Sequence, residues 1–154
     1  MTPNDVQLVQ ESFKSVRPIA AQAADLFYGR LFEVAPEVRP LFPEDLTEQK
    51  KKLMGMLGTV VANLHQVEKI LPAAKDLGRR HAGYGVKAAY YKPVGEALIW
   101  TLDKGLGEAF TPPVRAAWVA AYTTLAGVMQ EAAAAAAAAT PAPKGFLARV
   151  FARA

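Results

Sequence analysis

Hydrophobic residues recur at three- and four-residue steps along most of the chain, which is the spacing of one face of a helix. Thr2, Pro3 and Asp5 have the pattern of a capping box that begins the first helix. The breaks between the runs predict further helices at residues 19–35, 36–42, 47–70, from 72 to between 81 and 85, 90–107, and from 112 into a run of alanines. We expect Thr47 to cap the helix that begins there. The sequence has no alternating strand pattern, so the predicted fold class is all-α.

Two of these helices carry a polar residue at or beside their apolar stripe. Tyr28 lies on the stripe of its helix, and Gln49 lies about 40° from Leu53 on an ideal helix. A buried hydroxyl or amide without a partner costs about 1–3 kcal/mol, so both side chains need one. They can bond each other or water, or both can bond a polar ligand. The residues alone favour the first alternative.

Length and composition indicate one ordinary globular domain. The chain has 154 residues, of which 52% are hydrophobic and 21% charged, and it has no cysteine. We therefore expect neither disulfides nor a zinc site built on cysteine. The net charge is +4, but the basic residues are scattered, which favours a solvated surface over a nucleic-acid site. The long apolar stretch Ala116–Ala139 is mostly alanine and is read as a helix outside the membrane. No signal peptide is evident, and we expect a cytoplasmic protein.

The last fifteen residues differ in composition from the rest. We divide the chain into a helical domain, residues 1–139, and a Pro/Ala linker with a short basic and apolar tail, residues 140–154. The apolar residues of the tail recur at helical spacing among three cations. A tail that frays or packs loosely on the domain is favoured over one that folds on an anionic lipid surface.

His81 lies near the end of a predicted helix, four residues after Leu77 and on the same apolar face. Arg80 falls about a quarter turn aside, and Arg79 lies nearly opposite. A neutral imidazole in an apolar place needs a partner for each nitrogen. One nitrogen can bind a metal ion while the other bonds a backbone carbonyl. Alternatively, His81 is an ordinary core histidine with both nitrogens hydrogen-bonded, which is the commoner case. His65, the other histidine, lies about 160° round its helix from Gln49 and is expected at the surface.

Several of these features occur together in one known family. Seven or eight helices within about 140 residues, a short proline-started third helix ending in Leu41 and Phe42, and a lone inward histidine late in the chain resemble the globin family. The chain is most similar to bacterial single-domain globins, to the globin part of flavohaemoglobins and to Vitreoscilla-type haemoglobin. The resemblance covers residues 5–131. It implies the globin fold, a three-over-three helical sandwich around haem b.

The resemblance also implies a role for particular residues, carried by the stretches LFYGRLF, QKKKLM, LGRRHAGYGV and YYKPVG. His81 corresponds to the proximal iron ligand. Tyr28 and Gln49 correspond to the residues that face the bound ligand on the distal side. The expected haem contacts are Phe42, Leu53, Leu77, Val86, Tyr91 and Val94, and the expected partners of the haem propionates are Lys52 and Arg80.

One position departs from the flavohaemoglobin pattern. With Trp118 and Tyr122 aligned, a glutamate that bonds the proximal tyrosine and histidine in that family is replaced by Ala133. Glu131 lies nearby but on another face of the helix. The pattern of a flavin- and nicotinamide-binding reductase domain does not follow, so repeated redox turnover requires an external cellular reductase.

Three functions follow as hypotheses. The first is reversible binding of O2, with CO and NO as further ligands, made tight by hydrogen bonds from Tyr28 and Gln49. The second is nitric oxide dioxygenation with an external reductase, and the third is a sensor, either a haem-based gas sensor or a helical interaction module without haem. We expect a monomer or weak homodimer.

Overall fold

The computed structural model describes residues 1–83 and 86–139, and the expectations for the tail lie outside these ranges. Within them the structure is helical and contains no strand, which confirms the all-α prediction. The α-helices are α1 (Pro3–Val16), α2 (Ala20–Val34), α3 (Thr47–Ala62), α4 (Val67–Gly83), α5 (Tyr91–Leu106) and α6 (Pro112–Ala139). Short 3₁₀ helices join them: η1 (Arg17–Ile19), η2 (Pro36–Leu41), η3 (Leu64–Gln66), η4 (Ala88–Tyr90) and η5 (Gly107–Ala109).

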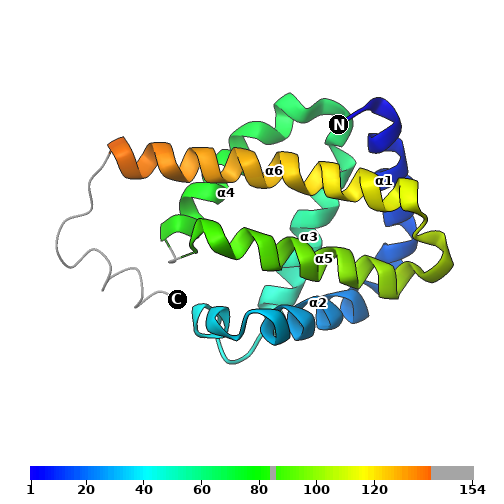
Figure 1. The fold of residues 1–154 in the computed structure, drawn as a ribbon, viewed down its shortest axis with the longest axis horizontal. Helices are drawn as coiled ribbons and strands as arrows, with labels where there is room; N and C mark the ends of the chain where they lie inside the picture. Colours follow the sequence, from blue (N-terminus) through cyan, green and yellow to red (C-terminus); the bar gives the residue numbers. More distant parts are fainter. Residues whose placement is uncertain (84–85, 140–154) are drawn as a thin grey trace.

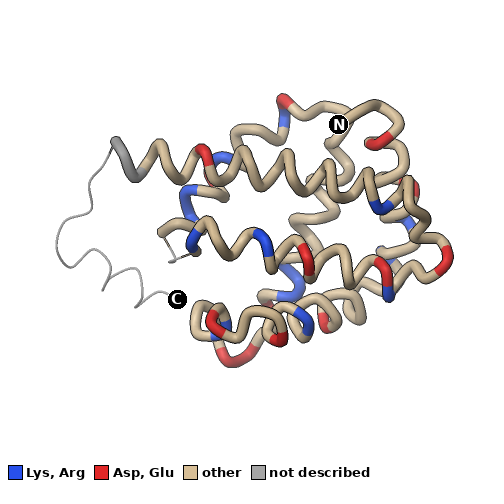
Figure 2. The backbone as a smooth tube through the Cα atoms, viewed as in Figure 1, with Lys and Arg blue, Asp and Glu red and all other residues tan. Residues whose placement is uncertain are grey.

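The helices form two crossed layers, as Figure 1 shows. The long helix α6 packs against α4 towards one end and against α1 towards the other, while α5 packs against α2. Helix α3 crosses behind α5 and α6 and contacts α2 and α1. Lys and Arg are scattered among Asp and Glu over the described helices (Figure 2). No helix within the described ranges is long and apolar enough to cross a membrane.

The capping box at the start of α1 is confirmed. The Thr2 backbone N–H donates to Asp5 Oδ2 over 2.9 Å, and the Asp5 N–H donates to the Thr2 hydroxyl over 3.1 Å. These bonds satisfy two donors that a helix start leaves without partners.

The start of α3 is held differently from the prediction. Thr47 does not cap the helix, because the Asp45 carboxylate takes that role by accepting from the Thr47 N–H (3.0 Å) and hydroxyl (2.7 Å). The same two bonds lower the pKa of Asp45. Leu46 occupies the position before the helix and gives no side-chain bond.

The predicted helix 47–70 is wrong at its end, and so is the predicted start at Pro72. Helix α3 ends at Ala62, where the Asn63 side-chain amide donates to the Thr59 carbonyl (2.8 Å) and the chain enters η3. Helix α4 then begins at Val67, so Pro72 lies inside it. A proline there removes only one bond of the helix ladder, and packing against α6 keeps the helix continuous.

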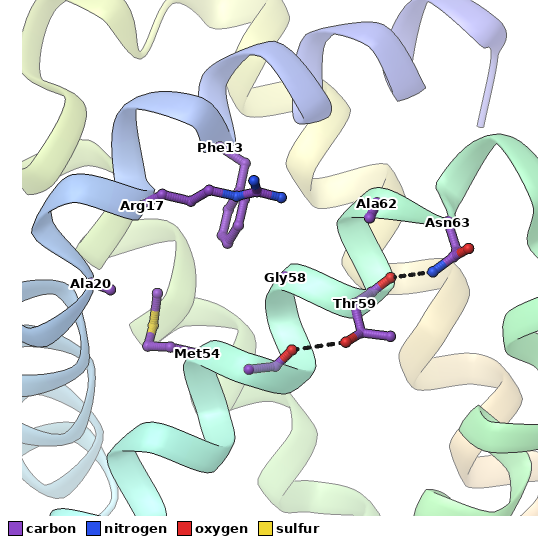
Figure 3. Close-up of a pocket in the computed structure, with 9 residues that line it drawn as sticks. Phe13, Arg17, Ala20, Met54, Gly58, Thr59, Ala62 and Asn63 are labelled. Atoms are coloured by element: carbon purple, nitrogen blue, oxygen red, sulfur yellow. Dashed lines mark hydrogen bonds between the residues drawn. The ribbon is translucent and has the colours of Figure 1, made fainter.

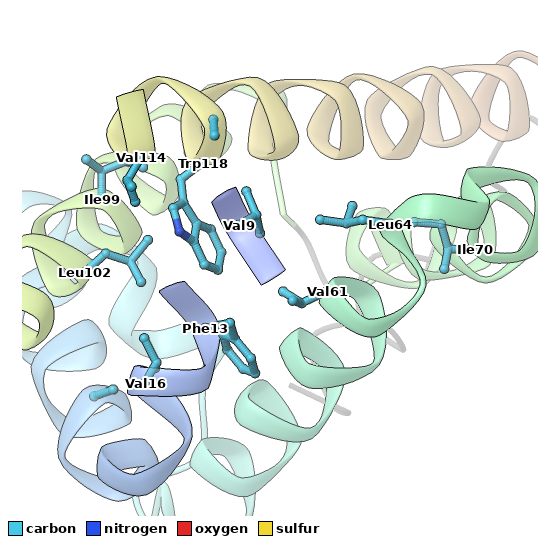
Figure 4. Packing of buried hydrophobic residues seen from close by; sticks show 12 residues of the cluster. Val9, Phe13, Val16, Val61, Leu64, Ile70, Ile99, Leu102, Val114 and Trp118 are labelled. Carbon is cyan, nitrogen blue, oxygen red and sulfur yellow. The ribbon is translucent and has the colours of Figure 1, made fainter. Parts of the chain in front are cut away.

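The larger hydrophobic core lies between α1, α3, α5 and α6 (Figure 4). Val9, Phe13 and Trp118 meet at its centre, with at most 3% of each residue exposed. The Trp118 indole N–H donates to the Ser12 hydroxyl over 2.8 Å, so its one polar atom is satisfied. Leu98 of α5 also contacts a second, smaller core beside α2, which makes the two cores continuous.

Helices α4 and α6 are in close contact at Gly78. A Cβ atom added to Gly78 would lie against the Met129 carbonyl oxygen and 2.6 Å from the Met129 Cα, both of which are main-chain atoms. No rotamer change can relieve such an overlap, so one helix would have to move. Because Gly78 precedes His81 by less than one turn, this contact sets where the His81 end of α4 lies relative to α6.

We therefore expect Gly78→Ala to lower the free energy of unfolding by about 1–3 kcal/mol, as overpacking of a tight contact does. Gly55→Ala is the matched control, because Gly55 is an exposed helical residue with no atom within 4 Å of an added Cβ. The control should be more stable than the parent by about 0.5–1 kcal/mol, since alanine favours helices. Urea unfolding followed by circular dichroism measures both. Equal stability of the two variants would show that α4 can shift freely along α6.

Candidate functional site

Four aromatic side chains form a cluster beside α2. The aromatic cluster consists of Phe27, Tyr28, Phe32 and Phe42, and the Tyr28 ring lies at its centre. The Tyr28 centroid lies 5.1 Å from that of Phe27 and 5.6 Å from that of Phe42, with the rings edge to face in both pairs. Such geometry is the preferred one for aromatic pairs and fixes the orientation of Tyr28.

Tyr28 and Gln49 are brought together, although α2 and α3 are separated by η2 and a loop. Only 4% of Tyr28 is exposed, and Gln49 is half-buried in the first turn of α3. Burial raises the pKa of Tyr28, and a hydrogen bond with the Gln49 side chain opposes part of that rise. An amide N–H donated to the phenol oxygen has this effect, because it stabilises the phenolate. The Tyr28 hydroxyl is therefore protonated at neutral pH and has its own proton to donate.

Other predicted contacts gather at the smaller core, which contains Phe27 and Tyr28. Leu53 and Val94 are half-buried and pack against this core from α3 and α5. On α3 the sole fully buried residue is Val61, so Leu53, Met56 and Val60 keep part of their apolar stripe uncovered. An apolar stripe of this kind suits a flat apolar group laid against it.

His81 lies in the last turn of α4 and is half-buried. Its Nδ1 lies 2.8 Å from the Leu77 carbonyl oxygen, which can only accept a hydrogen bond. Nδ1 therefore carries the ring proton, and Nε2 carries the free lone pair. Burial lowers the pKa of His81, the bond to Leu77 opposes this, and the charge of Arg80 adds to the lowering. The neutral ring with a free Nε2 is the form in which histidine binds a metal.

The residues after α4 continue this second group. The Val86 backbone N–H donates to the His81 carbonyl over 3.0 Å, and Val86 is half-buried. Leu77 contributes its main-chain carbonyl to the His81 ring, whereas the sequence had suggested a backbone carbonyl without identifying the residue. His65 is exposed, as expected, and its Nδ1 lies 3.3 Å from the Gln10 side-chain nitrogen.

Tyr91 begins α5, and its main-chain carbonyl accepts a hydrogen bond of 2.6 Å from the Tyr122 hydroxyl. The Tyr122 ring lies across Gly95, where an added Cβ would come within 2.6 Å of a ring carbon. Burial raises the pKa of both tyrosines, and both line a hollow of about 490 Å³ over α5 and α6. Ala133 is half-buried and Glu131 is exposed on the outside of α6.

Lys52 and Arg80 are both exposed. Arg80 forms an ion pair with Asp76, in which the Nε and the carboxylate oxygen lie 3.1 Å apart. Lys50, a neighbour of Lys52, pairs instead with Asp25 of α2 over 2.8 Å. The expected role of Lys52 and Arg80 as partners of an anionic group stays a prediction.

The structure thus arranges the predicted site residues in two groups. The first group consists of Tyr28 and Phe42, which belong to the aromatic cluster, with Gln49, Leu53 and Val94. The second group consists of His81, Leu77, Val86 and Tyr91, along the end of α4 and the start of α5. Tyr90, which the sequence reasoning missed, connects the groups because it precedes Tyr91 and packs against the smaller core that contains Phe27 and Tyr28. Tyr90 and Tyr91 are adjacent in the sequence, which was the available signal, but only Tyr91 had been assigned a role. Four more residues at the smaller core had also not been assigned to the site: Val38, Leu41, Leu46 and Leu98.

A separate hollow of about 420 Å³ lies between α1 and α3 (Figure 3). Phe13, Arg17 and Met54 face it, and the polar groups of Thr59 and Asn63 are bonded to carbonyls of α3 itself. None of the predicted site residues lines this hollow. It is therefore not the site that the sequence describes.

Comparison with known proteins shows the family to which the chain belongs. Residues 25–129 match the family model described as Globin. The chain belongs to the globin family. Globins and flavohaemoproteins bind haem, and globins bind small gas ligands, so the family supports both expectations for this globin.

Three relatives illustrate its place in the family. This globin is 34% identical over 125 residues to the Flavohemoprotein of Bacillus subtilis (strain 168), over 75% of this chain and 31% of the relative. It is 30% identical over 130 residues to the Flavohemoprotein of Rhizobium meliloti (strain 1021), over 80% of this chain and 32% of the relative. The Neuroglobin of Dissostichus mawsoni is 29% identical over 146 residues, which cover 85% of this chain and 91% of the relative. The chain thus spans about a third of the length of the flavohemoproteins it matches.

Solved structures show the same fold. An engineered carbene transferase, a variant of a proposed nitric oxide dioxygenase from Rhodothermus marinus, matches with a TM-score of 0.81 and 27% identity, over 90% of this chain and 97% of that chain. A bacterial globin from Campylobacter jejuni matches with a TM-score of 0.78 and 22% identity, over 88% and 98% of the two chains. The predicted globin fold is confirmed.

Proposed function

We propose that this globin carries haem b and binds O2 reversibly and tightly, with CO and NO as further ligands. The observation that carries the proposal is the bond from His81 Nδ1 to the Leu77 carbonyl, 2.8 Å long, which leaves Nε2 free. A metal-binding histidine characteristically bonds its second nitrogen to a carbonyl or carboxylate in this way. The donor set of one neutral imidazole, with apolar stripes and buried aromatic rings, fits haem.

On the proximal side, Leu77 and Gly78 determine how His81 is presented. The Leu77 carbonyl fixes the tautomer and the rotation of the imidazole ring. The tight contact between Gly78 and the Met129 main chain fixes the position of α4 relative to α6. A main-chain carbonyl carries no net charge, so it increases the basicity of the imidazole less than a carboxylate does. Ala133, at the position of the flavohaemoglobin glutamate, supplies no carboxylate. When bound, haem supplies an iron centre that takes a diatomic ligand.

On the distal side, Tyr28 and Gln49 provide two hydrogen-bond donors in a largely buried place. If Gln49 donates to the Tyr28 oxygen, the Tyr28 proton is free for a ligand, and the two bonds strengthen each other. A hydrogen bond to a charged acceptor contributes about 1.5–3 kcal/mol. Bound O2 is more polarised than bound CO, so this pair favours O2 selectively. Phe42, Leu53 and Val94 then exclude water around the ligand.

The remaining assignments belong to the same proposal. Val86 and Tyr91, which follow α4, and Leu77, one turn before His81 on α4, would contact haem on the His81 side. Lys52 and Arg80 would bind the haem propionates, since both are exposed cations, Lys52 on the helix of Gln49 and Leu53 and Arg80 beside His81. Arg80 must first exchange its ion pair with Asp76, which at the surface contributes little.

The similarity to the proposed nitric oxide dioxygenase from Rhodothermus marinus favours a second candidate function, nitric oxide dioxygenation. In that reaction NO and O2 combine to nitrate, and each turnover consumes one electron. The electron would come from a separate cellular reductase. Measuring the rate at which such a reductase returns the ferric protein to the ferrous state distinguishes the candidates. Recovery as fast as NO is consumed supports the dioxygenase, and slow recovery supports reversible O2 binding.

The proximal assignment predicts different behaviour of the two histidines. His81→Ala should lose haem or hold it at least about 100-fold more weakly, a loss of about 2.7 kcal/mol or more. The matched control is His65→Ala, because His65 is exposed and lies on another element. Titration of each apoprotein with haemin, followed by the Soret band, makes the comparison. Normal haem content in His81→Ala would reject the assignment.

The distal assignment predicts that Tyr28→Phe speeds O2 release by at least about tenfold, which corresponds to about 1.4 kcal/mol. CO release should change less, because CO makes a weaker demand on the donor. The ring and its contacts with Phe27 and Phe42 are kept in this variant, so packing changes little. Stopped-flow release rates for both ligands provide the test. Equal effects on O2 and CO would mean that Tyr28 acts by its shape and not as a donor.

A further inference from the structure

Arg39 of η2 holds the segment that leads from η2 into α3. Its guanidinium donates to three successive main-chain carbonyls: Nη1 to Phe42 over 3.3 Å, Nη1 to Pro43 over 3.0 Å, and Nη2 to Glu44 over 3.1 Å. No other side chain in the described ranges forms more than two hydrogen bonds to main-chain carbonyls. The planar guanidinium has five donors in fixed directions, which suits it to three acceptors at once.

The same guanidinium lies against the aromatic cluster. Its central carbon lies 5.1 Å from the centroid of the Phe32 ring. The Phe32 and Phe42 centroids are 5.6 Å apart, and Phe42 is in turn 5.6 Å from Tyr28. Arg39 therefore touches both the backbone of Phe42 and the ring on which the Phe42 side chain packs.

This segment has few other bonds to hold it. Phe42 is extended, with φ −114° and ψ 151°, so it belongs to no helix. Its N–H donates to the Arg39 carbonyl (3.1 Å), and Pro43 has no N–H to donate. Asp45 is bonded to Thr47, further along the chain. The hydrogen bonds that hold the main chain of Phe42 therefore come from residue 39, and its ring packs on Tyr28 and Phe32.

We propose that Arg39 is a positioning residue of the distal pocket, which fixes the Phe42 ring against Tyr28 by holding the carbonyls of residues 42–44. The inference rests on the proposed function, since it concerns how well that pocket holds haem and its ligand. When Arg39 releases these carbonyls, Phe42 leaves the edge of the Tyr28 ring more often. The Tyr28 hydroxyl then spends less time aimed at the ligand, and haem loses one of its flanking rings.

The test compares three variants of the haem-loaded protein. Arg39→Met keeps an unbranched stem over Phe32 but removes every donor. Arg39→Lys keeps the charge and can bond fewer carbonyls at once. Arg17→Met is the matched control, because Arg17 also lies over an aromatic ring, that of Phe13, at 5.5 Å, but belongs to η1. Three quantities are measured: haem transfer to an excess of apomyoglobin, the ratio of O2 to CO release, and hydrogen exchange of the amides of residues 42–47.

For Arg39→Met we expect haem loss at least about fivefold faster, which corresponds to about 1 kcal/mol, together with faster exchange at residues 42–47 and a raised ratio of O2 to CO release. Arg39→Lys should lie between Arg39→Met and the parent. Arg17→Met should stay within about twofold of the parent in all three, a difference of about 0.4 kcal/mol.

Two results would overturn the proposal. In the first, the rates of haem loss and of hydrogen exchange in Arg39→Met stay within about twofold of the parent, which corresponds to about 0.4 kcal/mol. In the second, Arg17→Met accelerates haem loss as much as Arg39→Met, which would indicate a general loss of stability. Failure of the proposed function is distinguishable, because a parent protein that takes up no haem rejects that function, whereas exchange at residues 42–47 still tests the hold of Arg39 on the segment.

Discussion

The hydrogen bond between His81 Nδ1 and the Leu77 carbonyl is the interaction on which the rest of the account depends. It is 2.8 Å long and joins residues one turn apart on α4. Because the carbonyl only accepts, the bond settles which ring nitrogen keeps its proton and which presents a lone pair. The helix thus prepares the imidazole with its own backbone. The position of the imidazole follows from the close crossing of α4 and α6 at Gly78, where main-chain atoms of Met129 leave no room for a side chain.

On the distal side, contacts between side chains determine the position of the site residues. On the proximal side, the position of helix α4 determines it. Tyr28 is oriented by rings on two sides, and the Gln49 side chain, which comes from the next α-helix, lowers its pKa against the effect of burial. The chain between those helices is held by Arg39, which bonds three main-chain carbonyls, and by Asp45, which bonds the main-chain N–H and the hydroxyl of Thr47. The two sides therefore differ in how they respond to substitution. A change at the crossing of α4 and α6 alters the whole helix, whereas a change at Arg39 loosens a few residues.

Periodicity was enough to predict an all-α chain, the capping box at Thr2 and the surface position of His65. It failed at helix ends, because Pro72 is accommodated inside α4 by packing on α6, and because Asp45 caps α3 from outside the apolar pattern. The candidate site came mainly from the resemblance to globins, which named His81, Tyr28 and Gln49. Arg39 and Tyr90 could not be found in this way. Their roles depend on main-chain acceptors outside the helices and on contacts between distant elements, and neither leaves a spacing in the sequence. A backbone carbonyl was expected as one partner of His81, but the structure was needed to identify it as that of Leu77.

Resonance Raman spectroscopy of the ferrous, ligand-free protein tests the central claim most directly. In the His65→Ala variant His81 is the single histidine of the chain. If His81 Nε2 is the proximal ligand, this variant shows an iron–nitrogen stretching band that moves to lower frequency when histidine is labelled with ¹⁵N. A band that does not move on labelling, or no such band in protein that holds one haem per chain, would contradict the assignment of His81.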